Sequence, residues 1–195
     1  MSRWILSAGL LLLVVSARPA SAAPIIGQQL FAAGGEVVVH FLGHTAAFTN
    51  ELYLFDPSDL TTPLGSPIFT THHTGVHSRT SLGTFAPGTE LVFGIYVRNT
   101  AHTYFMGPGG RNPDGLAHGA VSIKTAPYGF LRFAPAGMTG VGFEDLYGGG
   151  DRDFDDLGFA LSNVQPTHVP EPASLLLLAL GLTAAGLRRA RRPPA

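Results

Sequence analysis

Cysteine is absent from the 195-residue chain. Its absence excludes disulfide bonds, thiolate zinc sites and cysteine nucleophiles. The chain also lacks the G-x-S-x-G motif of α/β-hydrolases and the GxxxxGK[ST] phosphate-binding loop. These absences favour a protein that is not an enzyme, whose domain is held together by its core or by a bound metal ion.

Positive charge is scarce in the middle of the chain. Of the twelve lysines and arginines, two lie near the N-terminus and four near the C-terminus, which leaves six between Ala23 and Pro172. All thirteen acidic residues lie in that same stretch, so its formal net charge is −7. Because nucleic-acid binding needs a basic surface, we exclude nucleic acid as a partner.

Long apolar runs occur only at the two ends. The first follows Arg3, is too short to span a bilayer, and leads into small residues in the A-x-A arrangement, Ala20-Ser21-Ala22. This pattern is typical of a secretory signal peptide over residues 1–22 that is cleaved before Ala23. A permanent N-terminal anchor is the alternative.

The second apolar run, Ala173–Leu187, predicts a short transmembrane helix within a C-terminal segment that covers residues 166–195. Its fifteen residues would extend roughly 22 Å as a helix, less than the roughly 30 Å of a bilayer's hydrocarbon core. A cluster of arginines follows the run and is expected to stop transfer and stay on the cytoplasmic side, with the body outside. The cluster consists of Arg188, Arg189, Arg191 and Arg192.

The tripeptide Pro170-Glu171-Pro172, the apolar run and the arginine cluster together resemble the PEP-CTERM sorting signal of Gram-negative bacteria. The resemblance implies that a membrane-embedded exosortase recognises the tripeptide. It also implies a precursor held transiently in the inner membrane, whose body then reaches the outer surface or the extracellular matrix. A simple tail anchor is the alternative that the apolar run leaves open.

The stretch between these ends, residues 23–165, contains short β-branched or alternating apolar runs separated by turn-forming residues. No long part of it shows the 3.6-residue spacing of a helix. The pattern predicts an all-β domain, an antiparallel β-sandwich of jelly-roll or immunoglobulin-like type. The expected strands are Glu36–Leu42, Asn50–Asp56, Glu90–Asn99, His102–Met106, Ala120–Lys124, Gly129–Phe133 and Phe154–Leu161.

The sequence VGFEDLYGGGDRDFDDLGFAL, Val141–Leu161, concentrates negative charge: six acidic side chains lie within thirteen residues, with Arg152 as the one basic residue. Close like charges repel unless they are neutralised, and the D-x-D-x-D spacing lets carboxylates converge on a hard cation. The stretch therefore predicts a calcium site. Its candidate ligands are Glu144, Asp145, Asp151, Asp153, Asp155 and Asp156, with Glu51 and Asp56 as candidates from another strand. A solvated acidic loop without an ion is the alternative.

This stretch is not an EF-hand, because Asp156 replaces the required glycine and Ser162 the bidentate glutamate. It resembles instead an exported bacterial domain family of unknown function, marked by F-E-D-L, a glycine-rich turn and D-x-D-[FY]-x-D. In that family the acids are suspected metal ligands. The histidines do not indicate a zinc site, since His40 and His44 lie too far apart along an expected strand and the loop histidines lack a zinc-binding motif.

The sequence thus predicts an exported protein, sorted by an exosortase, with a structural or adhesive role in an exopolysaccharide or biofilm layer. Calcium is its expected cofactor, and extracellular polysaccharide is a candidate partner. The alternative is a secreted polysaccharide-active enzyme or a lectin-like module, for which aromatic residues such as Tyr96, Tyr104 and Tyr147 are candidate contacts.

Overall fold

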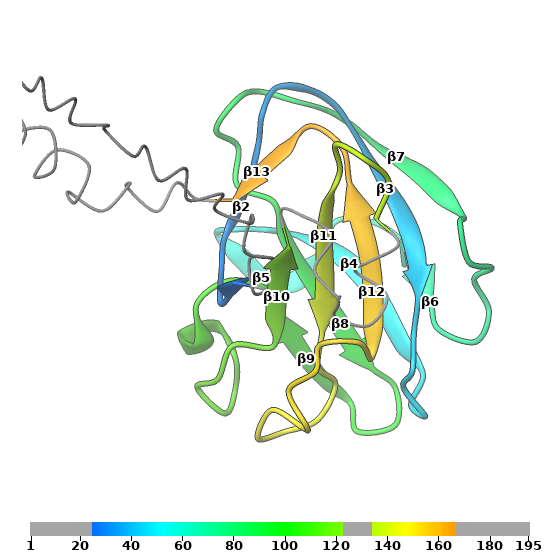
Figure 1. The fold of residues 1–195 in the computed structure, drawn as a ribbon. Coiled ribbons are helices and arrows are strands. Elements are labelled where there is room, and N and C mark those ends of the chain that lie inside the picture. The colour runs from blue at the N-terminus through cyan, green and yellow to red at the C-terminus, as the bar shows by residue number, and fades with distance from the viewer. Residues whose placement is uncertain (1–24, 123–133, 167–195) are drawn as a thin grey trace, which may run out of the picture.

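The computed structural model describes residues 25–122 and 134–166 (Figure 1). The regular structure in these ranges consists of β-strands and one 3₁₀ turn, Gly109–Arg111. Every strand pair is antiparallel. The all-β prediction is therefore confirmed, while the jelly-roll or immunoglobulin-like sandwich stays a prediction.

The larger sheet contains six strands in the order β1-β10-β11-β12-β3-β7. They are β1 (Ile25–Ile26), β10 (Gly119–Ser122), β11 (Thr139–Phe143), β12 (Leu157–Leu161), β3 (Gly35–Gly43) and β7 (Arg79–Phe85). The loop that joins β11 to β12 lies at the lower end of this sheet in Figure 1, beside the loop that joins β9 to β10.

The second sheet contains five strands, four of them in the order β5-β4-β8-β9. They are β5 (Asp59–Pro63), β4 (Asn50–Asp56), β8 (Val92–Val97) and β9 (His102–Phe105), while β6 (Phe69–Thr70) pairs with β4 beside this path. A separate two-stranded sheet joins β2 (Leu30–Ala32) to β13 (Val164–Pro166).

Alternation along the strands explains why the two main sheets share one hydrophobic core. Val37 and Val39 of β3 are fully buried, as are Phe93 and Ile95 of β8. Side chains from both sheets belong to one cluster. A large apolar side chain stabilises the fold by about 1.5–3 kcal/mol when it is fully buried. Because a slip of one residue would turn these side chains to the opposite face, the core fixes the register of each strand.

Some strands differ from the sequence prediction. The strand expected at Phe154–Leu161 begins only at Leu157, because Phe154 has a φ of 57° and belongs to the preceding loop. The strand β7 was not predicted because most of its residues are polar and exposed, and β11 was not predicted because it is short and glycine-containing. The strand expected at Gly129–Phe133 lies outside the described residues.

The expected targeting segments also lie outside the described residues. These are the signal peptide with its cleavage residues Ala20 and Ala22, and the C-terminal transmembrane helix with the flanking sorting tripeptide and arginines. Among the residues that the structure does describe, no helix has the length and apolar character needed to cross a membrane.

Candidate metal centre

The acidic stretch forms the loop between β11 and β12. Phe143 at the end of β11 pairs with Leu157 at the start of β12, so residues 144–156 form a loop that is closed at its base. A Cβ atom at Gly142 would lie 2.0 Å from the carbonyl oxygen of Phe154. The absence of a side chain at this position therefore lets the loop fold back against β11, where Phe154 is 4 % exposed.

Three carboxylates of the loop converge. Oxygen atoms of Glu144, Asp151 and Asp153 all lie within 4.8 Å of one another. Ligands on opposite sides of a calcium ion, each at 2.3–2.6 Å, are about 5 Å apart, so this spacing fits one calcium ion. No other group of three such side chains is present in residues 25–122 and 134–166.

Glu144 differs from its two partners because it is buried. Its side chain is 1 % exposed, whereas Asp151 and Asp153 are exposed. One carboxylate oxygen, Oε1, accepts a hydrogen bond of 2.6 Å from the backbone N–H of Phe154. The other oxygen, Oε2, is buried without a hydrogen-bond partner. It faces the glycine turn, since a Cβ atom at Gly150 would lie 2.3 Å from it.

The charges in this group are not neutralised by the protein. Burial raises the pKa of Glu144, and the nearby charges of Asp151 and Asp153 raise it further. Burial also raises the pKa of Asp153, together with the charges of Asp155 and Asp151. Among the described residues, no basic side chain forms an ion pair with the three carboxylates. The site therefore favours either protons or a cation.

The other three predicted loop ligands make hydrogen bonds outside the three-carboxylate group. Asp145 Oδ2 accepts a hydrogen bond of 2.8 Å from Asn50 Nδ2, and Asp156 Oδ2 accepts one of 2.9 Å from the backbone N–H of Asp145. Asp155 accepts a hydrogen bond from the hydroxyl of Thr45. Burial raises the pKa of Asp156 to about 7, with added repulsion from the neighbouring acids. Asp145 fastens the loop to β4 and Asp155 fastens it to the turn between β3 and β4, whereas Asp156 bonds within the loop itself.

The two candidate ligands from the other sheet do not reach the loop. Glu51 forms an ion pair with Arg98, the residue that follows β8. Asp56 accepts hydrogen bonds from the backbone N–H and the hydroxyl of Ser58. The three-carboxylate group identified in the described residues contains neither of them.

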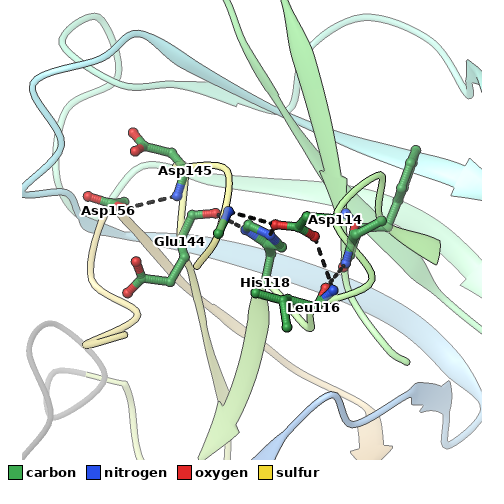
Figure 2. A network of polar contacts seen from close by, with 9 residues as sticks. Asp114, Leu116, His118, Glu144, Asp145 and Asp156 are labelled. Atoms are coloured by element: carbon green, nitrogen blue, oxygen red, sulfur yellow. Dashed lines mark hydrogen bonds and ion pairs between the residues drawn. The ribbon is translucent and has the colours of Figure 1, made fainter. Parts of the chain in front are cut away.

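A buried acid–histidine pair holds the start of the loop, and Figure 2 shows His118 between Asp114 and Glu144. His118 is fully buried; its Nε2 lies 2.8 Å from Asp114 Oδ2 and its Nδ1 lies 3.0 Å from the carbonyl oxygen of Glu144. The backbone N–H of Glu144 in turn donates a hydrogen bond of 2.9 Å to the carbonyl oxygen of His118. The pair therefore fixes the backbone from which the buried carboxylate projects.

Asp114 also binds the other side of the glycine turn. Its Oδ2 accepts a hydrogen bond of 2.8 Å from the backbone N–H of Gly148, and its Oδ1 accepts one of 3.0 Å from that of Leu116. Burial opposes the ionisation of Asp114, but these bonds and His118 outweigh burial and lower the pKa of Asp114 to about 2. An ionised Asp114 and the carbonyl oxygen of Glu144 are both hydrogen-bond acceptors, and they lie on opposite sides of the His118 ring.

Sequence reasoning missed Asn50, Asp114 and His118. The sequence Asn112-Pro113-Asp114-Gly115 indicated only a turn, and the contact between His118 and Glu144 joins residues 26 positions apart. The one sequence feature that could have indicated this pair is His118, which follows Asp114 by four residues and directly precedes a strand. The histidines considered for zinc pack differently: the backbone N–H of His72 donates to His44 Nε2 at 3.3 Å.

Comparison with known proteins bears on the C-terminal end of the chain. The PEP-CTERM protein-sorting motif matches residues 168–192, which include Pro170, Glu171, Pro172 and the arginine cluster. The motif marks the chain as an exported protein that is sorted by an exosortase from a membrane-anchored precursor. The matched residues lie outside the described part of the structure.

No significant match was found among curated proteins or among solved structures. The resemblance of the body to an exported domain family with the F-E-D-L motif is not supported by the comparisons and stays a hypothesis.

Proposed function

We propose that this chain is a structural or adhesive module of the cell surface or extracellular matrix, whose β-sandwich body is stabilised by one calcium ion outside the cytoplasm. The ion would be held by Glu144, Asp151 and Asp153. The observation that carries the proposal is the buried Oε2 atom of Glu144, which has no hydrogen-bond partner and lies beside two exposed carboxylates.

The energetic argument starts from the cost of a buried acceptor without a partner. Such a group costs about 1–3 kcal/mol, and more when it is charged. A cation at this position would give Oε2 a partner and would also neutralise the repulsion from Asp151 and Asp153. Hard oxygen ligands at this spacing match calcium, which accepts water molecules at the positions that the protein leaves open.

The proposed role is not catalytic. Two carboxylates about 5–5.5 Å apart are typical of retaining glycosidases, and the spacing within this group is similar. A catalytic acid must touch its substrate, however, and Glu144 is only 1 % exposed. A metal ligand can be buried in this way, so the geometry favours ion binding over glycan hydrolysis.

Calcium binding is tested by thermal unfolding of the full chain in mild detergent, with a chelator, with calcium and with magnesium. We expect calcium to raise the midpoint, because a ligand present at about 100 times its Kd stabilises the folded state by about 2.7 kcal/mol. Magnesium should raise the midpoint less, since it requires shorter and more regular coordination.

The matched variants separate the site from general charge effects. Asp151→Asn with Asp153→Asn should abolish the calcium shift. Asp56→Asn with Asp59→Asn changes the charge equally at an exposed turn and should retain the shift. An unchanged midpoint in excess calcium, or an equal shift in both double variants, would reject the proposed ion site.

A further inference from the structure

The second sheet carries a separate apolar cluster on the face that is turned away from the main core. Phe55, Val92 and Phe105 are buried there, with Tyr53 and Leu60 packed against them. Their strand neighbours, such as Leu54 and Phe93, belong to the main core instead. Because successive side chains of a strand point to opposite faces, the cluster lies on the outer face of β4, β8 and β9.

Glycine at position 94 leaves room for two aromatic rings over the middle of this face. A Cβ atom at Gly94 would lie 2.8 Å from Phe55 and 2.9 Å from Phe105. The two rings meet edge to face, with centroids 5.0 Å apart. An apolar floor is thus built into the outside of the sheet.

A hollow of about 260 Å³ opens beside this floor. Its lining combines the rings of Tyr53, Phe55 and Tyr96 with the hydroxyl-bearing side chains of Thr61 and Thr103. The register explains the arrangement, since Tyr96 of β8 lies between Glu51 of β4 and Thr103 of β9. Aromatic and polar groups therefore alternate across the hollow.

An ion pair is connected to the hollow through Tyr53, which lines it. Glu51 forms an ion pair with Arg98 and also accepts a hydrogen bond of 3.0 Å from the hydroxyl of Tyr53. Burial and the neighbouring Glu51 raise the pKa of Tyr53 to about 12, so its hydroxyl remains a donor at neutral pH. The side chain of Arg98 is 58 % exposed and keeps further N–H donors free for a ligand.

We propose that this hollow, between Tyr53, Tyr96 and Thr103, is a binding site for an uncharged glycan built of hexopyranose units. The C–H face of a pyranose ring would pack on Tyr96 and Tyr53, while its hydroxyls would meet Thr61, Thr103 and Arg98. The inference goes beyond the proposed calcium module and does not depend on calcium, because none of these residues belongs to the acidic loop.

Charge selects the uncharged glycan over an acidic one. No cation is among the described residues that line the hollow, and Arg98, which is connected to it through Glu51 and Tyr53, is already paired with Glu51. The stretch between Ala23 and Pro172 carries a formal charge of −7. A polyanionic polysaccharide would therefore be repelled over most of the surface and gain little at the site. A lipid chain is disfavoured because it offers no hydrogen-bond partner to the hydroxyl of Thr103 in the lining.

The test is affinity electrophoresis of the full chain in mild detergent through native gels that contain one polysaccharide each. The probes are hydroxyethylcellulose, laminarin, dextran and galactomannan as uncharged glycans, and alginate as an acidic one. We expect at least one uncharged glycan to retard the protein, with or without a chelator, and alginate not to retard it.

Variants locate the site. Tyr96→Ala should weaken binding by about tenfold or more, while Tyr96→Phe, which keeps the ring, should retain most of it. Tyr147→Ala is the matched control, because Tyr147 is 63 % exposed on the acidic loop and should not affect binding. If Tyr96→Ala does not fold, Thr103→Val keeps the side-chain shape, removes one hydroxyl and should weaken binding severalfold.

The proposal would be overturned by no retardation by any of the four uncharged glycans, by stronger retardation by alginate, or by equal retardation of wild type, Tyr96→Ala and Thr103→Val. Loss of retardation in the chelator would also overturn it, because the glycan would then bind through the ion. Failure of the calcium proposal would give a different result: the unfolding midpoint would not change in calcium, while glycan binding would be retained.

Discussion

Replacing Glu144 with glutamine separates the cost of the buried charge from its use as a ligand. The variant keeps the side-chain shape and leaves an oxygen to accept the hydrogen bond from the backbone of Phe154. Its amide group would take the position of the unpartnered Oε2, where it can donate to Asp151 or Asp153. We therefore expect the substitution to raise stability in the absence of calcium and to remove most of the gain that calcium gives.

Without calcium, Glu144→Gln should be more stable than the wild type. Removing an uncompensated buried charge should recover about 1–3 kcal/mol. For a chain of this size each kcal/mol corresponds to about 2–4 °C in the unfolding midpoint, so the gain is about 2–12 °C. With calcium at about 100 times its Kd, the wild type should gain about 2.7 kcal/mol, or roughly 5–11 °C, and the variant much less.

The assay is circular dichroism at neutral pH, with thermal unfolding of both proteins in chelator and in excess calcium. Glu36→Gln is the control, since Glu36 is exposed on β3 and the same charge is removed away from the loop. A variant that is destabilised equally under both conditions, or that keeps the full calcium shift, would refute the reasoning about Oε2.

Three further predictions follow from the loop and the sorting motif. Because the pKa of Asp156 is raised in the folded state, its contribution to stability is complete below the ordinary pKa of 3.8 and is lost as the pH rises through about 7. Urea unfolding without calcium should therefore show a free energy of unfolding that declines over that range, and calcium should reduce the decline. Gly142→Ala should cost about 1–3 kcal/mol because its Cβ would meet backbone, whereas Gly110→Ala, with open space around it, should cost far less by the same urea measurement. Replacing Glu171 with alanine should leave uncut precursor in the inner membrane, detected by fractionation and mass spectrometry of both chain ends; normal processing would contradict recognition of the tripeptide.

The parts of the fold that sequence predicts are those with strong local patterns. A continuous β-branched run identified β3 and alternation identified β4; in the structure Val37 and Val39 point inward, and so do Leu52 and Leu54. The edge strand β7 has no such pattern, since its residues are largely exposed and its position is set by pairing with β3. A strand defined by its partner, and not by its own burial, gives little signal in a single sequence.

The candidate site divides in the same way. Spacing drew attention to the acids of residues 144–156, but it does not distinguish Asp151, which joins the converging group, from Asp155, which binds Thr45. That distinction depends on which side of the loop faces the turn between β3 and β4 and which faces the glycine turn. The contact of His118 with Glu144 depends on strands β10 and β11 lying side by side, which no local pattern encodes.

The sorting motif and the proposed ion site make a consistent pair. Two of the three proposed ligands, Asp151 and Asp153, are exposed, and a proton competes with calcium at Glu144 because its pKa is raised. These features suit a weak site, and extracellular calcium modules have Kd values of about 10⁻⁴–10⁻³ M. Such a site would be empty where calcium is scarce and would fill where calcium is plentiful. If the proposed function is right, the body would therefore reach its full stability only after export, outside the cytoplasm, and export is what the sorting motif indicates.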